Sequence, residues 1–147
     1  MYALKIAISR KQRKMLELFK SKQKTAQARI LIIDDDLDLL GTIQRKLEHY
    51  QWQIDTAANG REGLAKIANK KPDLILLDIK MPIMNGHEML EHLRKDRNFK
   101  DIPVIMCTRC FGVQDVAKAA SYNISAYIAK PFDCTELTDK IYECLNK

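Results

Sequence analysis

Acidic residues in this sequence follow two apolar runs, where a carboxylate could act as a metal ligand or a nucleophile. Asp34, Asp35 and Asp36 come directly after RILII, and Asp78 follows the unbroken run 74–77. Clustered carboxylates repel one another, and a hard cation such as Mg²⁺ relieves that repulsion because it prefers oxygen ligands. If the two runs are neighbouring strands, the sequence predicts an acidic Mg²⁺ site at their ends.

A simpler interpretation is that these acids cap helices. A carboxylate stabilises the N-terminal end of a helix, so Asp35 or Asp36 could cap the helix expected next. Asp78 has no such role, because residues 79–84 separate it from the next helix start near Asn85. The sequence therefore singles out Asp78 as a functional carboxylate.

A hydroxyl and an ammonium group follow two further apolar runs. Thr108 comes after VIMC, and Lys130 stands in AKPF. At the same edge of a sheet as a metal-bound aspartate, these two groups could hold the oxygens of a phosphoryl group, the lysine as a point charge and the threonine as a hydrogen-bond donor. Each residue alone is ordinary, and it is the combination at successive strand ends that indicates a site.

The elements that must position these residues alternate along the chain. Short apolar runs predict strands at 29–33, 51–57, 73–77, 102–107 and 125–129, and the more polar second run indicates an edge strand. Helical spacing of apolar residues predicts a helix after each strand, and Asn85 with Glu88 resembles a capping box at the start of the third. The pattern predicts a flavodoxin-like α/β fold, a (βα)₅ doubly wound parallel sheet with strand order 2-1-3-4-5, which brings the ends of strands 1 and 3 to one crevice.

Four segments in order, ILIIDDD, PDLILLDIKMPIMNG, VIMCT and YIAKPF, resemble the receiver domains of two-component response regulators, the CheY-like superfamily, over residues 29–146. The resemblance implies that Asp78 is the phospho-acceptor. It also implies a Mg²⁺ site made by Asp34, Asp35, Asp78 and the backbone carbonyl of Lys80.

The same resemblance assigns roles around the acceptor. Thr108 and Lys130 would contact the phosphoryl group, Tyr127 would change its exposure on activation, and the Lys130–Pro131 peptide bond would be cis. The family further implies a phosphohistidine donor, either a sensor histidine kinase or a histidine phosphotransfer protein. A downstream effector protein would receive the signal by contact, and the domain would be a signalling module and not a multiple-turnover enzyme.

One position departs from the family pattern. Receivers usually carry a small residue directly after the threonine, whereas this chain has Arg109. Arg109 either points to solvent or reaches inward, where it would pair with Asp78 or its phosphoryl group and change the phosphorylation kinetics.

Two other classes of function fit parts of the pattern. Asp34 and Asp36 mimic the nucleophile motif of a haloacid-dehalogenase-like phosphatase, with Thr108 and Lys130 in its later positions, but this interpretation leaves Asp78 unexplained. A degenerate receiver that acts only as a protein-binding module is the other alternative, supported by Arg109. Nucleotide-phosphate sites are disfavoured, because the sequence has neither a G-x-G-x-x-G motif nor a P-loop.

Charge divides the chain of 147 residues into two parts. Residues 1–29 hold nine lysines and arginines against Glu17, a net charge of +8 within a total of +6, so the rest carries −2. We therefore expect a basic N-terminal extension, residues 1–28, and a receiver domain, residues 29–147. The extension is expected to be solvated. The alternatives are that it forms a homodimer or binds an anionic membrane surface or nucleic acid. Residues 2–8 alternate like a short strand, and Ser9 with Gln12 resembles a capping box before a helix.

The remaining composition indicates a cytoplasmic protein. No apolar run is long enough to span a membrane, and the basic first residues lack the apolar core of a signal peptide. The four cysteines have neither a disulfide-scaffold nor a zinc-site spacing, although Cys107 and Cys110 form a C-x-x-C that we interpret as incidental. The three histidines are expected at the surface.

Overall fold

The computed structural model describes residues 9–25, 27–109 and 112–147, and within them the fold centres on a five-stranded parallel sheet in the order β2-β1-β3-β4-β5. This order and the position of β2 at an edge confirm the prediction. The strands are shorter than the apolar runs by a residue or two in most cases. Their bounds are β1 (Arg29–Ile33), β2 (Gln53–Ala57), β3 (Leu74–Leu77), β4 (Val104–Thr108) and β5 (Ala126–Ala129).

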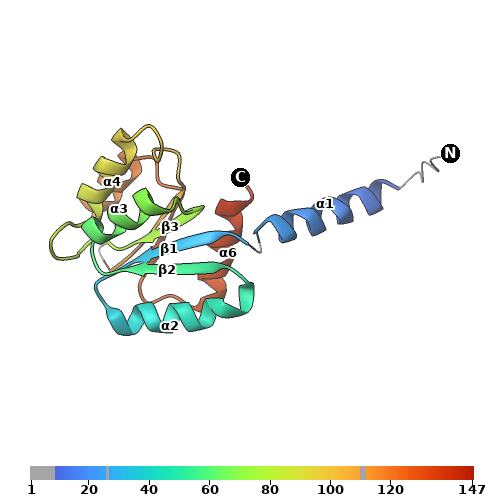
Figure 1. The fold of residues 1–147 in the computed structure, drawn as a ribbon, viewed down its shortest axis with the longest axis horizontal. Helices are drawn as coiled ribbons and strands as arrows, with labels where there is room; N and C mark the ends of the chain where they lie inside the picture. The colour runs from blue at the N-terminus through green and yellow to red at the C-terminus, as the bar shows by residue number, and fades with distance from the viewer. Residues whose placement is uncertain (1–8, 26, 110–111) are drawn as a thin grey trace.

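Helices cover both faces of the sheet, as a doubly wound fold requires. Figure 1 shows α3 and α4 on one side of β1–β3 and α2 on the other. The apolar core divides in the same way, with α2 and α6 over one face and α3, α4 and α5 over the other. The bounds are α2 (Leu37–Leu47), the short 3₁₀ helix η1 (Glu48–Tyr50), α3 (Gly60–Asn69), α4 (Gly86–Lys95), α5 (Val113–Ser121) and α6 (Cys134–Leu145).

Alternation along the strands explains why the apolar runs are uninterrupted. Successive side chains of a strand point to opposite faces, and Ile30 and Ile32 of β1 lie in one core while Leu31 and Ile33 lie in the other. Every residue of β3 is buried. A polar side chain within a central strand that is covered on both faces would be buried in apolar surroundings. Asp78 follows the last residue of β3 and is therefore the first position at which a polar side chain is tolerated.

Local hydrogen bonds fix where the helices begin. Asn85 and Glu88 form the predicted capping box at α4. Asp36 caps α2 by accepting a hydrogen bond from the Leu39 N–H at 3.0 Å. Of the two acids proposed as caps, Asp36 therefore has the structural role.

A further helix, α1 (Arg10–Thr25), precedes the domain and extends away from it (Figure 1). Ser9 and Gln12 form reciprocal hydrogen bonds at its start, as the capping-box pattern predicted. The Ser9 N–H donates to Oε1 of Gln12 with a nitrogen-to-oxygen distance of 2.8 Å, and the Gln12 N–H donates to Oγ of Ser9 at 3.2 Å. The strand-like alternation of residues 2–8 lies outside the described residues. No helix in the described ranges is long and apolar enough to cross a membrane.

Candidate functional site

The site is built where the sheet hydrogen bonding runs one residue past the strands. The Asp34 N–H donates to the Ala57 carbonyl, and the Asp78 N–H donates to the Ile33 carbonyl, both at 3.0 Å. Between β4 and β5, the Lys130 N–H donates to the Thr108 carbonyl at 3.0 Å. Each backbone is therefore held by the sheet, while its side chain lies at the open end.

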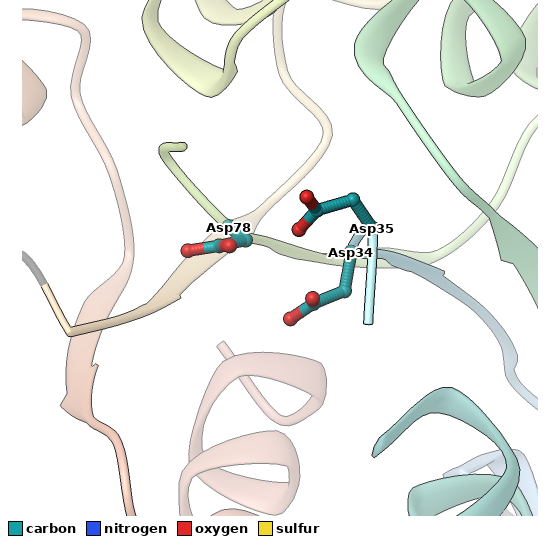
Figure 2. Close-up of side chains that lie close together, drawn as sticks. All are labelled: Asp34, Asp35 and Asp78. Atoms are coloured by element: carbon teal, nitrogen blue, oxygen red, sulfur yellow. The ribbon is translucent and has the colours of Figure 1, made fainter. Parts of the chain in front are cut away.

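Three carboxylates converge at this edge (Figure 2). Asp34, Asp35 and Asp78 each offer an oxygen within 4.8 Å of the others. Asp34 and Asp78 are 3% and 7% exposed, whereas Asp35 is exposed. Two buried acids and one exposed acid therefore surround a single point that solvent can reach from one side.

Lys130 neutralises part of this charge. Its Nζ forms an ion pair with Oδ2 of Asp34 and lies 3.5 Å from Oδ2 of Asp78, and its side chain is 8% exposed. Burial raises the pKa of Asp34, because removing a carboxylate from water disfavours its charged form. Hydrogen bonds from Lys130 and from the Asp36 N–H oppose that rise in pKa.

Backbone N–H groups orient the two buried acids. Oδ1 of Asp34 accepts a hydrogen bond from the Asp36 N–H at 2.9 Å, and Oδ1 of Asp78 accepts one from the Ile79 N–H at 2.8 Å. The second oxygen of each carboxylate faces Lys130. Both side chains are thus fixed before any ligand binds.

Gly86 holds the loop after Asp78 close to the strand end, a role that the sequence analysis missed. Its N–H donates to the Ile79 carbonyl at 2.8 Å. A Cβ atom at this position would lie 2.2 Å from the carbonyl oxygen of Asp78. Only glycine lets the start of α4 approach the backbone of Asp78 this closely, and the signal in the sequence was the Asn-Gly pair at 85–86.

The side chains predicted for the site line one cleft of about 350 Å³. Its lining consists of Asp34, Asp35, Asp36, Asp78, Lys80, Thr108, Arg109 and Lys130. Thr108 is 1% exposed at the end of β4, and Lys80 is exposed at the opening. Arg109 is exposed, as one of its two predicted orientations requires, and it lines the edge of the same cleft.

Two further residues, Tyr127 and Pro131, were predicted for the site. Tyr127 is partly buried on β5 and packs against the core under α3, α4 and α5. The Lys130–Pro131 peptide bond is cis, as the resemblance implied.

The prediction of three surface histidines is wrong for His87. It lies in α4 with 7% of its surface exposed, and its Nε2 is 3.5 Å from Oδ1 of Asp115 on α5. Burial lowers the pKa of His87, and Asp115 opposes that change. The sequence spacing gave no warning, because His87 follows the cap of α4 and its face depends on how that helix packs.

Cys107, Cys134 and Cys144 are free cysteines in the described part of the chain. Cys107 is 5% exposed, and burial raises the pKa of its thiol to about 12. A thiol that stays protonated is a poor nucleophile and a poor metal ligand. Cys110 lies outside the described residues.

The donor set fits a hard divalent cation. Mg²⁺ takes oxygen ligands at about 2.1 Å, so opposite ligands lie roughly 4.2 Å apart, and the three carboxylates reach that spacing with a small adjustment. A nearby lysine and threonine offer a cation and a hydroxyl to an anion at the same point. An acidic cleft with this constellation, at the switch point of a doubly wound sheet, defines a receiver-type signalling domain.

Comparison with known proteins places the chain in a family. A family model described as response regulator receiver domain matches residues 30–142. The chain is 34% identical over 119 residues to the DNA-binding dual master transcriptional regulator RpaA of Synechocystis, a match that covers 81% of this chain and 49% of that protein. The chain belongs to the response regulator receiver domain family.

Solved structures agree with this assignment. A CheY-like response regulator receiver domain protein from Methanospirillum hungatei is 38% identical with a TM-score of 0.77, covering 82% of this chain and 94% of that one. The phosphorylated cyanobacterial phytochrome response regulator RcpA is 25% identical with a TM-score of 0.70, covering 80% of this chain and 90% of that one. The chain spans about half the length of the curated relatives it matches.

Proposed function

We propose that the chain is a phosphoacceptor module that takes a phosphoryl group from a phosphohistidine onto Asp78. The position of Asp78 carries the proposal. It is a buried carboxylate without a capping role, it lies in the acidic cluster, and one of its oxygens is 3.5 Å from Nζ of Lys130. A relative of similar fold has been crystallised in a phosphorylated form.

The proposed reaction is a displacement at phosphorus. A carboxylate oxygen of Asp78 attacks the phosphoryl group, the P–N bond to the donor imidazole breaks, and an aspartyl phosphate forms. Asp34, Asp35, Asp78 and the carbonyl of Lys80 would hold Mg²⁺, which screens the negative charge of the phosphoryl oxygens. Lys130 and Thr108 supply an ammonium and a hydroxyl to the same oxygens.

Activation would follow from the new charge beside Thr108. The hydroxyl is drawn toward the phosphoryl group, and the segment after β4 moves with it, so that α5, β5 with Tyr127, and α6 shift between two conformations. A sensor histidine kinase or a histidine phosphotransfer protein is the proposed donor, and an effector protein that contacts these elements is the proposed receiver of the signal. The proposed unit for this function is residues 29–147.

One contact weighs against the phosphatase alternative. Asp36, which would be its second acid, caps α2 by accepting a hydrogen bond from the Leu39 N–H. The binding-module alternative rests on Arg109, and the exposed position of this residue at the cleft edge leaves the acceptor accessible.

Intact-mass measurement with acetyl phosphate and Mg²⁺ tests the proposal. The wild type is expected to gain one phosphoryl group that is labile to base, and the Asp78→Asn variant none. Asp36→Asn is the matched control, because asparagine also caps helices and the residue lines the same cleft, so this variant should still react. A phosphorylated Asp78→Asn protein, or label mapping to Asp34, would refute the assignment.

A further inference from the structure

The first helix has an apolar face that the receiver domain leaves exposed. Met15, Leu16 and Phe19 of α1 are 64%, 46% and 63% exposed. Figure 1 shows the helix extending away from the sheet and its covering helices. Large apolar side chains cost free energy in water, so a helix that keeps three of them exposed on one face indicates an interaction surface.

Charge frames that face on both sides. With about 100° between successive residues, Met15, Phe19 and Leu16 span roughly 100° of the helix surface, and Gln12 falls inside this span. Lys11 borders one side of the span, and Arg13 and Lys20 border the other. Glu17, the single acid of α1, lies on the opposite side of the helix. Counted over the whole helix, seven basic residues stand against that one acid.

We propose that α1 binds the surface of an anionic lipid bilayer and lies in its interface. Lysine and arginine beside an apolar face can keep their charges among acidic headgroups while their methylene chains and the apolar side chains enter the acyl boundary. The charge distribution supports this partner. Residues 30–147 carry −2, so the attraction to an anionic surface resides in the N-terminal part of the chain. The sequence before α1 adds Tyr2, Leu4, Ile6 and Ile8 to the apolar residues of this part.

The structure favours a bilayer over the two other partners of such a helix. In a pair of α1 helices, the basic residues on both sides of the apolar face would meet basic residues, because Glu17 lies on the far side. The apolar face is also confined to residues 15–19, which is short for a coiled-coil seam. Nucleic acid would use the positive charge but would leave Phe19 and Met15 in water.

Docking in this manner would leave the acceptor site open. α1 joins the sheet at the start of β1, whereas Asp34 and the cleft lie at the end of the same strand. The bilayer would therefore lie near one end of the sheet and the phosphoryl donor would approach the other. The proposal goes beyond the phosphoacceptor function and does not depend on it.

Vesicle co-sedimentation of the full chain tests the proposal, with vesicles of phosphatidylglycerol and phosphatidylcholine in equal parts and vesicles of phosphatidylcholine alone. We expect binding to the anionic vesicles, weakened by added salt, and binding to the neutral vesicles that is roughly tenfold weaker or less. Phe19→Ser and Leu16→Ser should each weaken binding by about tenfold.

Leu18→Ser is the matched control within the helix. Leu18 is 56% exposed and lies about 60° from Met15 and about 100° from Phe19 around the axis, at the edge of the face beside Lys11, so its substitution should weaken binding less than Phe19→Ser does. Equal losses for Phe19→Ser and Leu18→Ser would overturn the proposed face.

Three results would overturn the choice of partner. Tighter binding to duplex DNA than to the anionic vesicles, unaffected by Phe19→Ser, would assign the helix to nucleic acid. A doubled mass in solution that Phe19→Ser reduces to the single mass would assign it to a second copy of the chain. Absence of binding to the anionic vesicles at low salt would also refute the proposal. An Asp78→Asn protein should bind the vesicles as the wild type does, which separates this test from that of phosphorylation.

Discussion

Substitution of Gly86 by alanine tests how tightly the backbone of Asp78, the proposed acceptor, is held. The added Cβ would lie 2.2 Å from the Asp78 carbonyl oxygen, 3.0 Å from the Ile79 Cα and 3.1 Å from the Asp78 carbonyl carbon. All three atoms belong to the backbone, so no change of rotamer can relieve the contact. Either the start of α4 moves outward or the peptide after Asp78 rotates.

The expected cost follows from this geometry. Overpacking a tight site costs about 1–3 kcal/mol, and contacts with backbone place Gly86→Ala near the upper end, about 3 kcal/mol. For a chain of this size that corresponds to a fall in melting temperature of roughly 10 °C. The displaced backbone also carries Asp78, so the rate of phosphorylation should fall with the stability.

Gly41→Ala is the matched control. Gly41 lies inside α2, and a Cβ there would have nothing within 4 Å. Alanine is the better helix former, so this variant should be more stable by up to about 1 kcal/mol and should react at the wild-type rate. Thermal unfolding followed by circular dichroism, with intact-mass measurement of phosphorylation, compares the two variants. A Gly86→Ala protein with wild-type stability and rate would show that the close approach has no role in positioning Asp78.

Four further outcomes are expected. Asp35→Asn should weaken Mg²⁺ binding by roughly tenfold or more in calorimetry, because it removes one of three charged oxygen ligands, and an unchanged affinity would exclude Asp35 as a ligand. His87 should make the protein less stable in acid, because burial lowers its pKa from 6.5 in the folded state. As the pH drops below 6.5, the unfolded chain takes up a proton at this residue before the folded chain does, so the free energy of unfolding falls. Denaturant titrations should show a smaller fall for His87→Gln and the full fall for His92→Gln, which alters an exposed residue of the same helix. Arg109→Ala should change the lifetime of the phosphorylated form, and equal decay rates would mean that its guanidinium acts only in solvent. A chain that begins at Ala28 should still fold and accept a phosphoryl group, since the cleft and both cores lie downstream; loss of folding would make α1 part of the domain.

The sequence predicts the sheet well because its central strands are continuous apolar runs with clear ends. β3 is buried along its whole length and ends in a charged residue, so both its existence and its end are visible in LILLD. α5 is less well determined. Its apolar residues mark a helix, yet Val113 is 85% exposed and Ala119 is the residue buried against the core. Small side chains give a weak pattern, so the helix rotation is set by tertiary packing.

The sequence indicates candidate site residues where chemistry requires a side chain, and it misses positions where packing requires the absence of one. The acids, Thr108 and Lys130 were found because charged and polar groups at strand ends are conspicuous, and all of them line one cleft. Gly86 acts through the absence of a side chain, and His87 through the face of α4 on which it falls. Neither the close approach at Gly86 nor the burial of His87 can be predicted from residue type and spacing. Both depend on how closely α4 packs against its neighbours.

The length of β1 separates the basic N-terminal segment from the acidic cleft. The strand has five residues, which at about 3.3 Å each span roughly 17 Å between the end of the basic segment and the acidic cleft. Electrostatic attraction between exposed charges is screened within about 8 Å at physiological ionic strength, so the field of α1 has largely decayed at Asp34 and Asp78. Inside the cleft the charges act at a few ångströms and away from water, where screening is weak. The proposed basic docking surface at one end of β1 and the proposed phosphoryl site at the other can therefore coexist in one chain, because neither changes the electrostatic potential at the other.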